Sequence, residues 1–174
     1  LFPLLYHLYP RKSTITNEKG EFFMIYITDS LISTQPRPKQ GTGTPKEDFN
    51  YIANYRPDKA IPKEWLQQEE RGFQKAKLRS KYFIPGKFSK LYRADSNLEE
   101  KTLIVLDIDN TDLSYSELIY HLAEKINQYN YCVYPTINHQ EGNTRARVVI
   151  EPDRAYNKDE HTYLFYDLSE ALDL

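Results

Sequence analysis

The chain has 174 residues and a formal net charge of −2, with 40% hydrophobic and 28% charged residues. This composition predicts a folded globular protein with a real core and excludes a disordered chain. No apolar run is long enough to cross a membrane, and no signal-peptide pattern is visible. The single cysteine, Cys132, excludes an internal disulfide and a cysteine zinc cluster, and it favours a reducing, cytoplasmic setting.

The charged residues are unevenly distributed along the chain. Between Arg71 and Arg93 there are eight Lys or Arg and no acid, whereas the stretch from Thr102 to the end holds thirteen Asp or Glu against five Lys or Arg. This asymmetry indicates one surface for phosphates and another for a metal ion. Because the sequence begins at Leu1 without a methionine and ends inside an expected helix, we expect it to be a piece of a longer polypeptide.

The first hundred residues contain few regular patterns. β-Branched and aromatic residues predict a buried strand from Gly20 to Thr28, and the Pro- and Gly-containing stretch from Thr34 to Lys46 predicts a long loop. Lys63 to Gln74 is expected to be helical. The basic segment follows it, and aromatic residues are interleaved with its cations.

The second half shows a clearer order of elements. The expected strands are Thr102 to Asp109, Tyr131 to Tyr134 and Arg145 to Glu151, and the expected helices are Ser114 to Tyr129 and the residues after Asn157. A capping box opens each helix, formed by Ser114 with Glu117 and by Asn157 with Glu160. The core stripes are Leu118, Ile119, Leu122, Ala123 and Ile126 in the first helix, and Leu164, Leu168 and Ala171 in the second. This order predicts an α+β fold with helices packed on one face of a small, mostly antiparallel sheet.

Asp107 and Asp109 lie at the end of the first of these strands. Side chains two residues apart on a strand share a face, so both carboxylates are expected to point the same way. Neighbouring carboxylates repel one another unless one is protonated or a cation lies between them, and Mg²⁺ or Mn²⁺ prefers such oxygen ligands. The alternative reading is that Asp109 to Asp112 forms a turn with an Asx cap.

His139, Arg145 and Arg147 follow on the later loop and strand. A loop histidine beside two arginines on one strand face provides a clamp for an anion, because guanidinium groups match phosphate oxygens and histidine adds a donor. If this strand lies beside the one that carries the aspartates, metal and phosphate ligands converge, as nucleotidyl transfer requires. Taken alone, His139 would be a solvated loop residue, and the arginines would equally well form the polar outer face of a half-buried strand.

These motifs resemble those of the archaeo-eukaryotic primase superfamily, in particular the primase domains of replication proteins on bacterial phages, plasmids and genomic islands. The motifs are Leu-Ile-Val-Leu-Asp107-Ile-Asp109-Asn, Tyr-Pro-Thr-Ile-Asn-His139 and Arg145-Ala-Arg147-Val-Val-Ile, within about residues 75 to 174. The resemblance implies that Asp107 and Asp109 are catalytic and hold Mg²⁺ or Mn²⁺. It also implies that His139 binds the incoming nucleoside triphosphate, assisted by Arg145 or Arg147.

The resemblance further implies how the whole chain is organised. Residues 101–174 would form a palm-like metal and nucleotide site on an RRM-like sheet, and residues 1–100 an N-terminal α/β region of the same catalytic unit. The third acidic residue of the family lies on a later strand, so we expect it beyond Leu174 or lost. The implied partners are a single-stranded DNA template, nucleoside triphosphates and a helicase domain of the same longer chain.

The basic segment fits a template or primer surface, since cations bind phosphates and aromatic rings stack on bases. The candidate nucleic-acid-binding residues are Lys75, Lys77, Arg79, Lys81 and Lys87. The alternative reading of the segment is an ordinary solvated edge whose aromatic residues belong to the core.

Two other functions compete with nucleotidyl transfer. The run Val-Leu-Asp107-Ile-Asp109-Asn-Thr also resembles the first motif of haloacid-dehalogenase-like phosphatases, in which the first Asp is a nucleophile and the second a general acid and base. That family has a parallel Rossmann-like sheet and needs a later lysine and an acidic pair, which Lys158 and the adjacent Asp159-Glu160 match poorly. The third reading is a non-catalytic nucleic-acid-binding module of a replication protein.

Overall fold

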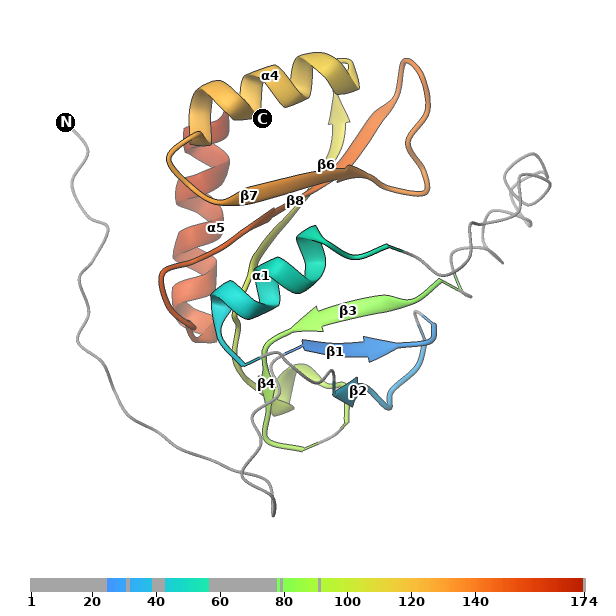
Figure 1. Cartoon of the computed structure of the whole chain (residues 1–174), viewed down its shortest axis with the longest axis vertical. Coiled ribbons are helices and arrows are strands. Elements are labelled where there is room, and N and C mark those ends of the chain that lie inside the picture. The colour runs from blue at the N-terminus through green and yellow to red at the C-terminus, as the bar shows by residue number, and fades with distance from the viewer. Residues whose placement is uncertain are drawn as a thin grey trace.

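The computed structural model describes residues 25–30, 32–38, 43–56, 78, 80–90 and 92–173 (Figure 1). Within these residues the architecture is mixed α+β, with three α-helices and three small antiparallel sheets. The strand orders of the sheets are β2-β1-β3, β4-β5 and β6-β8-β7. The α+β class predicted from the sequence is therefore confirmed.

The second half of the chain forms the sheet β6-β8-β7 and the two helices that follow its strands. In chain order the elements are β6 (Ile104–Thr111), α4 (Tyr115–Ile126), β7 (Tyr131–Pro135), β8 (Thr144–Ile150) and α5 (Lys158–Leu172). This is the predicted order of strand, helix, strand, strand and helix. β8 is the central strand and pairs antiparallel with both β6 and β7.

Both helices begin where the capping boxes predict. The side chain of Ser114 accepts a hydrogen bond from the backbone N–H of Glu117, whose carboxylate accepts one from the N–H of Ser114, and Asn157 and Glu160 do the same at α5. Leu118, Leu122 and Ile126 are buried against the sheet as predicted. Helix α5 completes this core with Leu172, which is buried, and with partly buried residues. The prediction is wrong for Ala171, which is exposed.

The first half of the chain supplies the smaller sheets and one helix. Its elements are β1 (Ile25–Thr28), β2 (Arg37–Pro38), α1 (Pro45–Ala53), β3 (Tyr82–Pro85), β4 (Lys87–Phe88), a 3-10 turn (Asp95–Asn97) and β5 (Leu98–Glu100). The predicted loop from Thr34 to Lys46 is wrong in part, because it contains β2 and the start of α1. Thr44 caps this helix by accepting the N–H of Glu47, and Pro45 stands in its first turn. The predicted helix from Lys63 to Gln74 lies outside the described residues.

The sheet β6-β8-β7 has a core on each face. On one face, alternate residues of β6, from Ile104 to Ile108, and of β8, from Ala146 to Ile150, pack against α4 and α5. On the other face Val105 and Val149 join a second core, to which α1 contributes Phe49 and β1 contributes Ile25. The prediction of helices on one face holds for α4 and α5, whereas α1 packs against the opposite face (Figure 1).

A buried hydrogen bond joins α1 to the residues just before β6. Asp48 and Thr102 are both fully buried, and the hydroxyl of Thr102 donates to the carboxylate of Asp48. Burial raises the pKa of Asp48 to about 6, although the hydrogen bond from Thr102 acts in the opposite direction. This hydrogen bond thus links α1 to the segment that leads into the strand with the acidic pair.

Candidate nucleotide and metal site

The first group of the candidate site is a row across the sheet. Asp107 of β6 is the register partner of Arg147 of β8, and Arg147 is in turn the partner of Tyr134 of β7. Nε of Arg147 donates to Oδ1 of Asp107 over 2.6 Å. The guanidinium group of Arg147 also hydrogen-bonds the Tyr134 side chain. Three neighbouring strands therefore place an acid, a base and a phenol side by side.

The second row lies one pleat further along the same face. Nη1 of Arg145 lies 3.5 Å from Oδ1 of Asp109. The backbone N–H of Arg145 points at Nδ1 of His139 over 3.4 Å, and the ring of Tyr115 packs against the His139 ring at a centroid distance of 5.4 Å. Since Nδ1 accepts in this arrangement, Nε2 is the protonated nitrogen and is the one able to donate to an anion.

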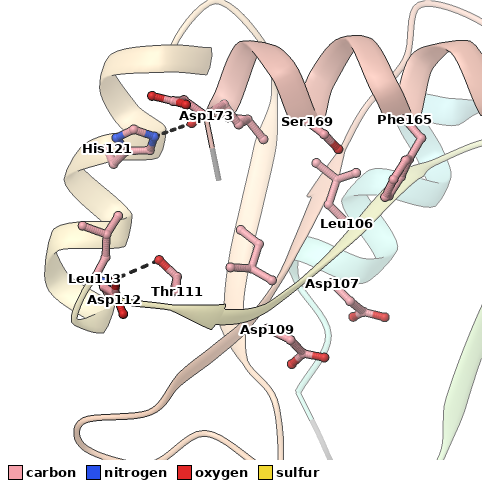
Figure 2. A pocket seen from close by; sticks show the side chains of 12 residues that line it. Leu106, Asp107, Asp109, Thr111, Asp112, Leu113, His121, Phe165, Ser169 and Asp173 are labelled. Carbon is pink, nitrogen blue, oxygen red and sulfur yellow. Dashed lines mark hydrogen bonds between the residues drawn. The ribbon is translucent and has the colours of Figure 1, made fainter.

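Both carboxylates of the acidic pair are open to solvent. The side chains of Asp107 and Asp109 are 55% and 51% exposed. Figure 2 shows that they project from β6 on the side away from Leu106 and α5. The structure therefore brings together Asp107, Asp109, Arg145, Arg147 and His139, and it places both carboxylates on one face as the alternation of the strand predicts.

The charges in these two rows compensate one another. Burial lowers the pKa of Arg147, but its hydrogen bond with Asp107 and its contact with Tyr134 outweigh this effect, so the pKa is raised. Burial also raises the pKa of Tyr134, while the nearby Arg147 lowers it. In this structure the cations that face the two carboxylates are thus arginines, one for each acid.

The donor set is compatible with a hard divalent cation. Mg²⁺ commonly binds one or two carboxylates and completes its octahedron with water and substrate phosphate oxygens. Asp107 and Asp109 provide two exposed carboxylates on one face, and the arginines that now pair with them can transfer to phosphate. Among the described residues, no cluster of three or more His, Cys, Asp or Glu could hold a metal. Any ion here would therefore depend on water and ligand oxygens.

A cavity of about 480 Å³ lies beside β6, next to α5. Its wall includes Leu106, Thr111, His121 and Phe165, and Asp173 lies at the end of α5. His121 hydrogen-bonds the backbone carbonyl of Leu172 through Nε2 over 2.5 Å, which ties α4 to the end of α5. Asp107 and Asp109 also line this cavity, so it reaches the acidic pair of the two rows (Figure 2).

Two of the five candidate nucleic-acid-binding residues lie in the part of the chain that the structure describes. Lys81 is exposed just before β3. Lys87 in β4 is only 15% exposed, and its Nζ lies 3.5 Å from Oε2 of Glu99, so this lysine already has an acidic partner. Lys75, Lys77 and Arg79 lie outside the described residues.

Tyr134 is the member of the site that sequence reasoning missed. It opens the Tyr-Pro-Thr-Ile-Asn-His139 motif at the end of a short strand, but the resemblance implied a role only for His139 of that motif. The available signal is its alternation with Cys132, which puts both on one face of β7, but the pairing of β7 with Arg147 cannot be read from β7 alone. Tyr82 of β3 is close enough to Arg147 and Arg93 for their charges to oppose the effect of burial on its pKa, which is raised.

The fold and the site together define an antiparallel α+β domain with an acidic and basic face. None of the helices in the described residues is long and apolar enough to span a membrane. Residues 74–174, more than half of the chain, match the VapE N-terminal domain family, and the chain belongs to that family. No curated protein and no solved structure matched the chain. The family match names a domain and no activity, so the likeness to primases stays a prediction.

Proposed function

We propose that this chain is the catalytic domain of a primase or primase-polymerase that serves the replication of a mobile genetic element. Its reaction would be metal-dependent attack of a 3′-hydroxyl on a nucleoside triphosphate, directed by a single-stranded DNA template. The reaction belongs in the cytoplasm, where DNA and nucleotides are found. A helicase domain of the same longer polypeptide is the partner we expect.

The observation that carries the proposal is the pair of rows on one sheet face. Asp107 and Asp109 stand next to Arg147 and Arg145, and His139 lies beside Arg145. A polyphosphate needs both kinds of group, because its charge is neutralised by arginine and by a divalent ion. Two acids two residues apart with facing arginines provide both within one small surface.

Each residue has a distinct part in the proposed reaction. Asp107 and Asp109 would hold Mg²⁺ or Mn²⁺, which when bound neutralises the triphosphate and favours ionisation of the attacking hydroxyl. Arg145 and Arg147 would exchange their carboxylate partners for phosphate oxygens. His139 would donate from Nε2 to the triphosphate. Lys81 and its basic neighbours would bind the template backbone.

A third carboxylate remains part of the proposal. The described residues contain two acids on this face and no third member of the cluster. Among the strands that the structure describes, β6 is an edge strand of its sheet, so a further strand carrying an Asp has a place to pair. We therefore expect full turnover when such a strand supplies the third carboxylate.

The antiparallel sheet weighs against the phosphatase alternative. β6, which carries Asp107, pairs antiparallel with β8 over most of its length, whereas the phosphatase reading needs a parallel Rossmann-like sheet. The reading as a non-catalytic nucleic-acid-binding module is separated from ours by experiment.

The direct test is synthesis of labelled dinucleotides and longer primers on single-stranded DNA by the natural protein, with Mg²⁺ or Mn²⁺. We expect product that is lost, by about 100-fold or more, in Asp107→Ala and in Asp109→Ala, as for removal of a principal transition-state group. Asp112→Ala is the matched control, because Asp112 is exposed just after the same strand and lines the same cavity but belongs to neither row.

Three results would contradict the proposal. One is the absence of labelled product with any template and either metal. Another is a protein that makes no product but binds single-stranded DNA without a metal, and still binds it in Asp107→Ala. This result would support the non-catalytic module. The third is phosphatase turnover that disappears in Asp107→Asn, which would support the phosphatase.

A further inference from the structure

The site face changes from apolar to polar along the direction of its strands. The first row, Val105, Val149 and Cys132, belongs to the core formed with α1 and β1. The next row holds Asp107, Arg147 and Tyr134, and the last holds Asp109, Arg145 and the adjoining His139. Successive rows are about 7 Å apart, since each residue of a strand advances about 3.3 Å. The gradient therefore runs from a buried apolar core to an exposed charged end.

Tyr134 stands at the boundary between these environments. Its ring is partly buried against the core that includes Val149, as are the rings of Phe83 in β3 and Tyr51 in α1. Its hydroxyl end interacts with the guanidinium group of Arg147. Aromatic carbon thus faces the apolar end of the site, and the phenol oxygen faces its charged end.

A nucleotide has the same two-ended character. Its base is a flat apolar surface that stacks on aromatic side chains, and its triphosphate is a strong anion that binds arginine and histidine. From this match we infer that the incoming nucleotide lies across the rows in one direction, with its base and sugar against Tyr134 and its triphosphate over Arg145 and His139. This inference rests on the proposed function and adds the orientation of the substrate and the residue that recognises its nucleoside part.

The reverse orientation is physically unfavourable. It would place a charged triphosphate against the partly buried aromatic rings of Tyr134, Phe83 and Tyr51, where burial of an unpaired anion is unfavourable. It would also leave the base at the exposed end, beside His139, where charged groups surround it. Arg147 lies between the two ends, and the hydroxyl of Tyr134 helps to fix its guanidinium group.

The first test compares the binding of two probes, ATP and inorganic triphosphate, measured by calorimetry with Mn²⁺. Tyr134→Leu removes the ring, and we expect it to weaken ATP binding by about 10-fold, within the range for loss of one stacked ring, and to change triphosphate binding little. His139→Ala should weaken both probes by the same factor. Tyr131→Leu is the matched control, because Tyr131 is on the same strand but packs against the opposite core.

The second test needs no substitution and so does not depend on the folding of a variant. 8-Azidoadenosine triphosphate carries its photoreactive group on the base, and the labelled peptide of the wild-type protein is identified by mass spectrometry. We expect labelling of β7 around Tyr134 or of β3 around Phe83. Labelling of the loop around His139 would overturn the inference, as would equal weakening of both probes in Tyr134→Leu.

The two proposals fail in different ways. If the wild-type protein binds neither ATP nor triphosphate, the proposed function itself is wrong, and the inferred orientation is wrong with it. If it binds both and Asp107→Ala abolishes synthesis, but the label lies near His139, the proposed function stands and only the orientation is wrong. Tyr134→Phe separates the ring from the hydroxyl, since it should retain the preference for ATP over triphosphate.

Discussion

The two faces of the sheet β6-β8-β7 are built from alternate residues of the same strands, and they differ in what they contain. The face toward α4 and α5 is uniformly apolar, from Ile104 to Ile108 on β6 and from Ala146 to Ile150 on β8. The other face is apolar only at one end and carries two acid–arginine pairs at the other. One face therefore stabilises the fold by apolar burial along its whole length. The other buries less apolar surface, because charged groups occupy part of it.

The helix face should carry the largest stability effect. Leu122 of α4 is fully buried, and truncating a buried leucine leaves a cavity, so Leu122→Ala is expected to lower the free energy of unfolding by about 2–5 kcal/mol. Urea unfolding followed by circular dichroism measures this loss. Tyr120→Ala on the same helix is the control, because Tyr120 is 77% exposed and its loss should change stability by about 0.5 kcal/mol or less. Equal effects of the two substitutions would show that the helix face of the sheet does not depend on the burial of Leu122.

The opposite face should show a pH effect at its junction with α1. Asp48 has an ordinary pKa of 3.8 and a folded value of about 6. A raised carboxyl pKa means that the fold favours the protonated form, so its contribution to stability is complete below about pH 4 and is lost as the pH rises through about 6. The loss reaches roughly 3 kcal/mol, since a tenfold change in proton affinity corresponds to about 1.4 kcal/mol.

Asp48→Asn tests this expectation, because asparagine stays neutral and can still accept the hydroxyl of Thr102. The variant should be more stable than the wild type at pH 7, and the difference between the two should shrink between pH 6 and pH 4. Thermal unfolding across this pH range gives the comparison. A difference that does not vary with pH would show that Asp48 is not the titrating group.

Arg147 should affect metal and phosphate in opposite directions. It pairs with Asp107 in the structure, so Arg147→Gln removes a cation that competes with a metal ion and also removes a ligand for phosphate. Loss of a charged hydrogen bond is expected to weaken triphosphate binding by about 10- to 100-fold. Mn²⁺ binding should be as strong as before or stronger. Calorimetry with each ligand separately measures both, and a parallel loss of Mn²⁺ binding would place Arg147 in a structural role.

The elements of the second half were predictable from the sequence because their signals are local. The capping boxes of Ser114 and Asn157 fix where the helices begin, and the alternation of Ala146, Val148 and Ile150 fixes the buried face of β8. The shared face of Asp107 and Asp109 follows from the same period of two residues. These features depend on neighbours within a few positions, so the sequence carries them directly.

What the sequence did not predict depends on pairing between distant segments. The register that joins Asp107 to Arg147 and Tyr134 spans three strands, and it decides that arginines face the acids in this structure. Helix α1 was missed because Pro45 and the preceding Gly residues are also typical of a loop, although Thr44 and Glu47 mark its start. The burial of Lys87 beside Glu99 similarly requires knowledge of the β4–β5 pair.

The smallest expected effect decides how the acid–arginine pairs should be understood. Asp109 and Arg145 lie 3.5 Å apart, and the acid is half exposed, so solvent screens their attraction. A double-mutant cycle with Asp109→Asn and Arg145→Gln should therefore give a coupling energy below about 1 kcal/mol. Chemical unfolding of the four proteins measures this coupling. A pair so weakly coupled can exchange its partner for a metal ion or a phosphate at little cost to the fold, as the proposed site requires. A coupling of several kcal/mol would instead identify the pair as structural. The charged face would then stabilise the fold, as the helix face does, although its residues are different.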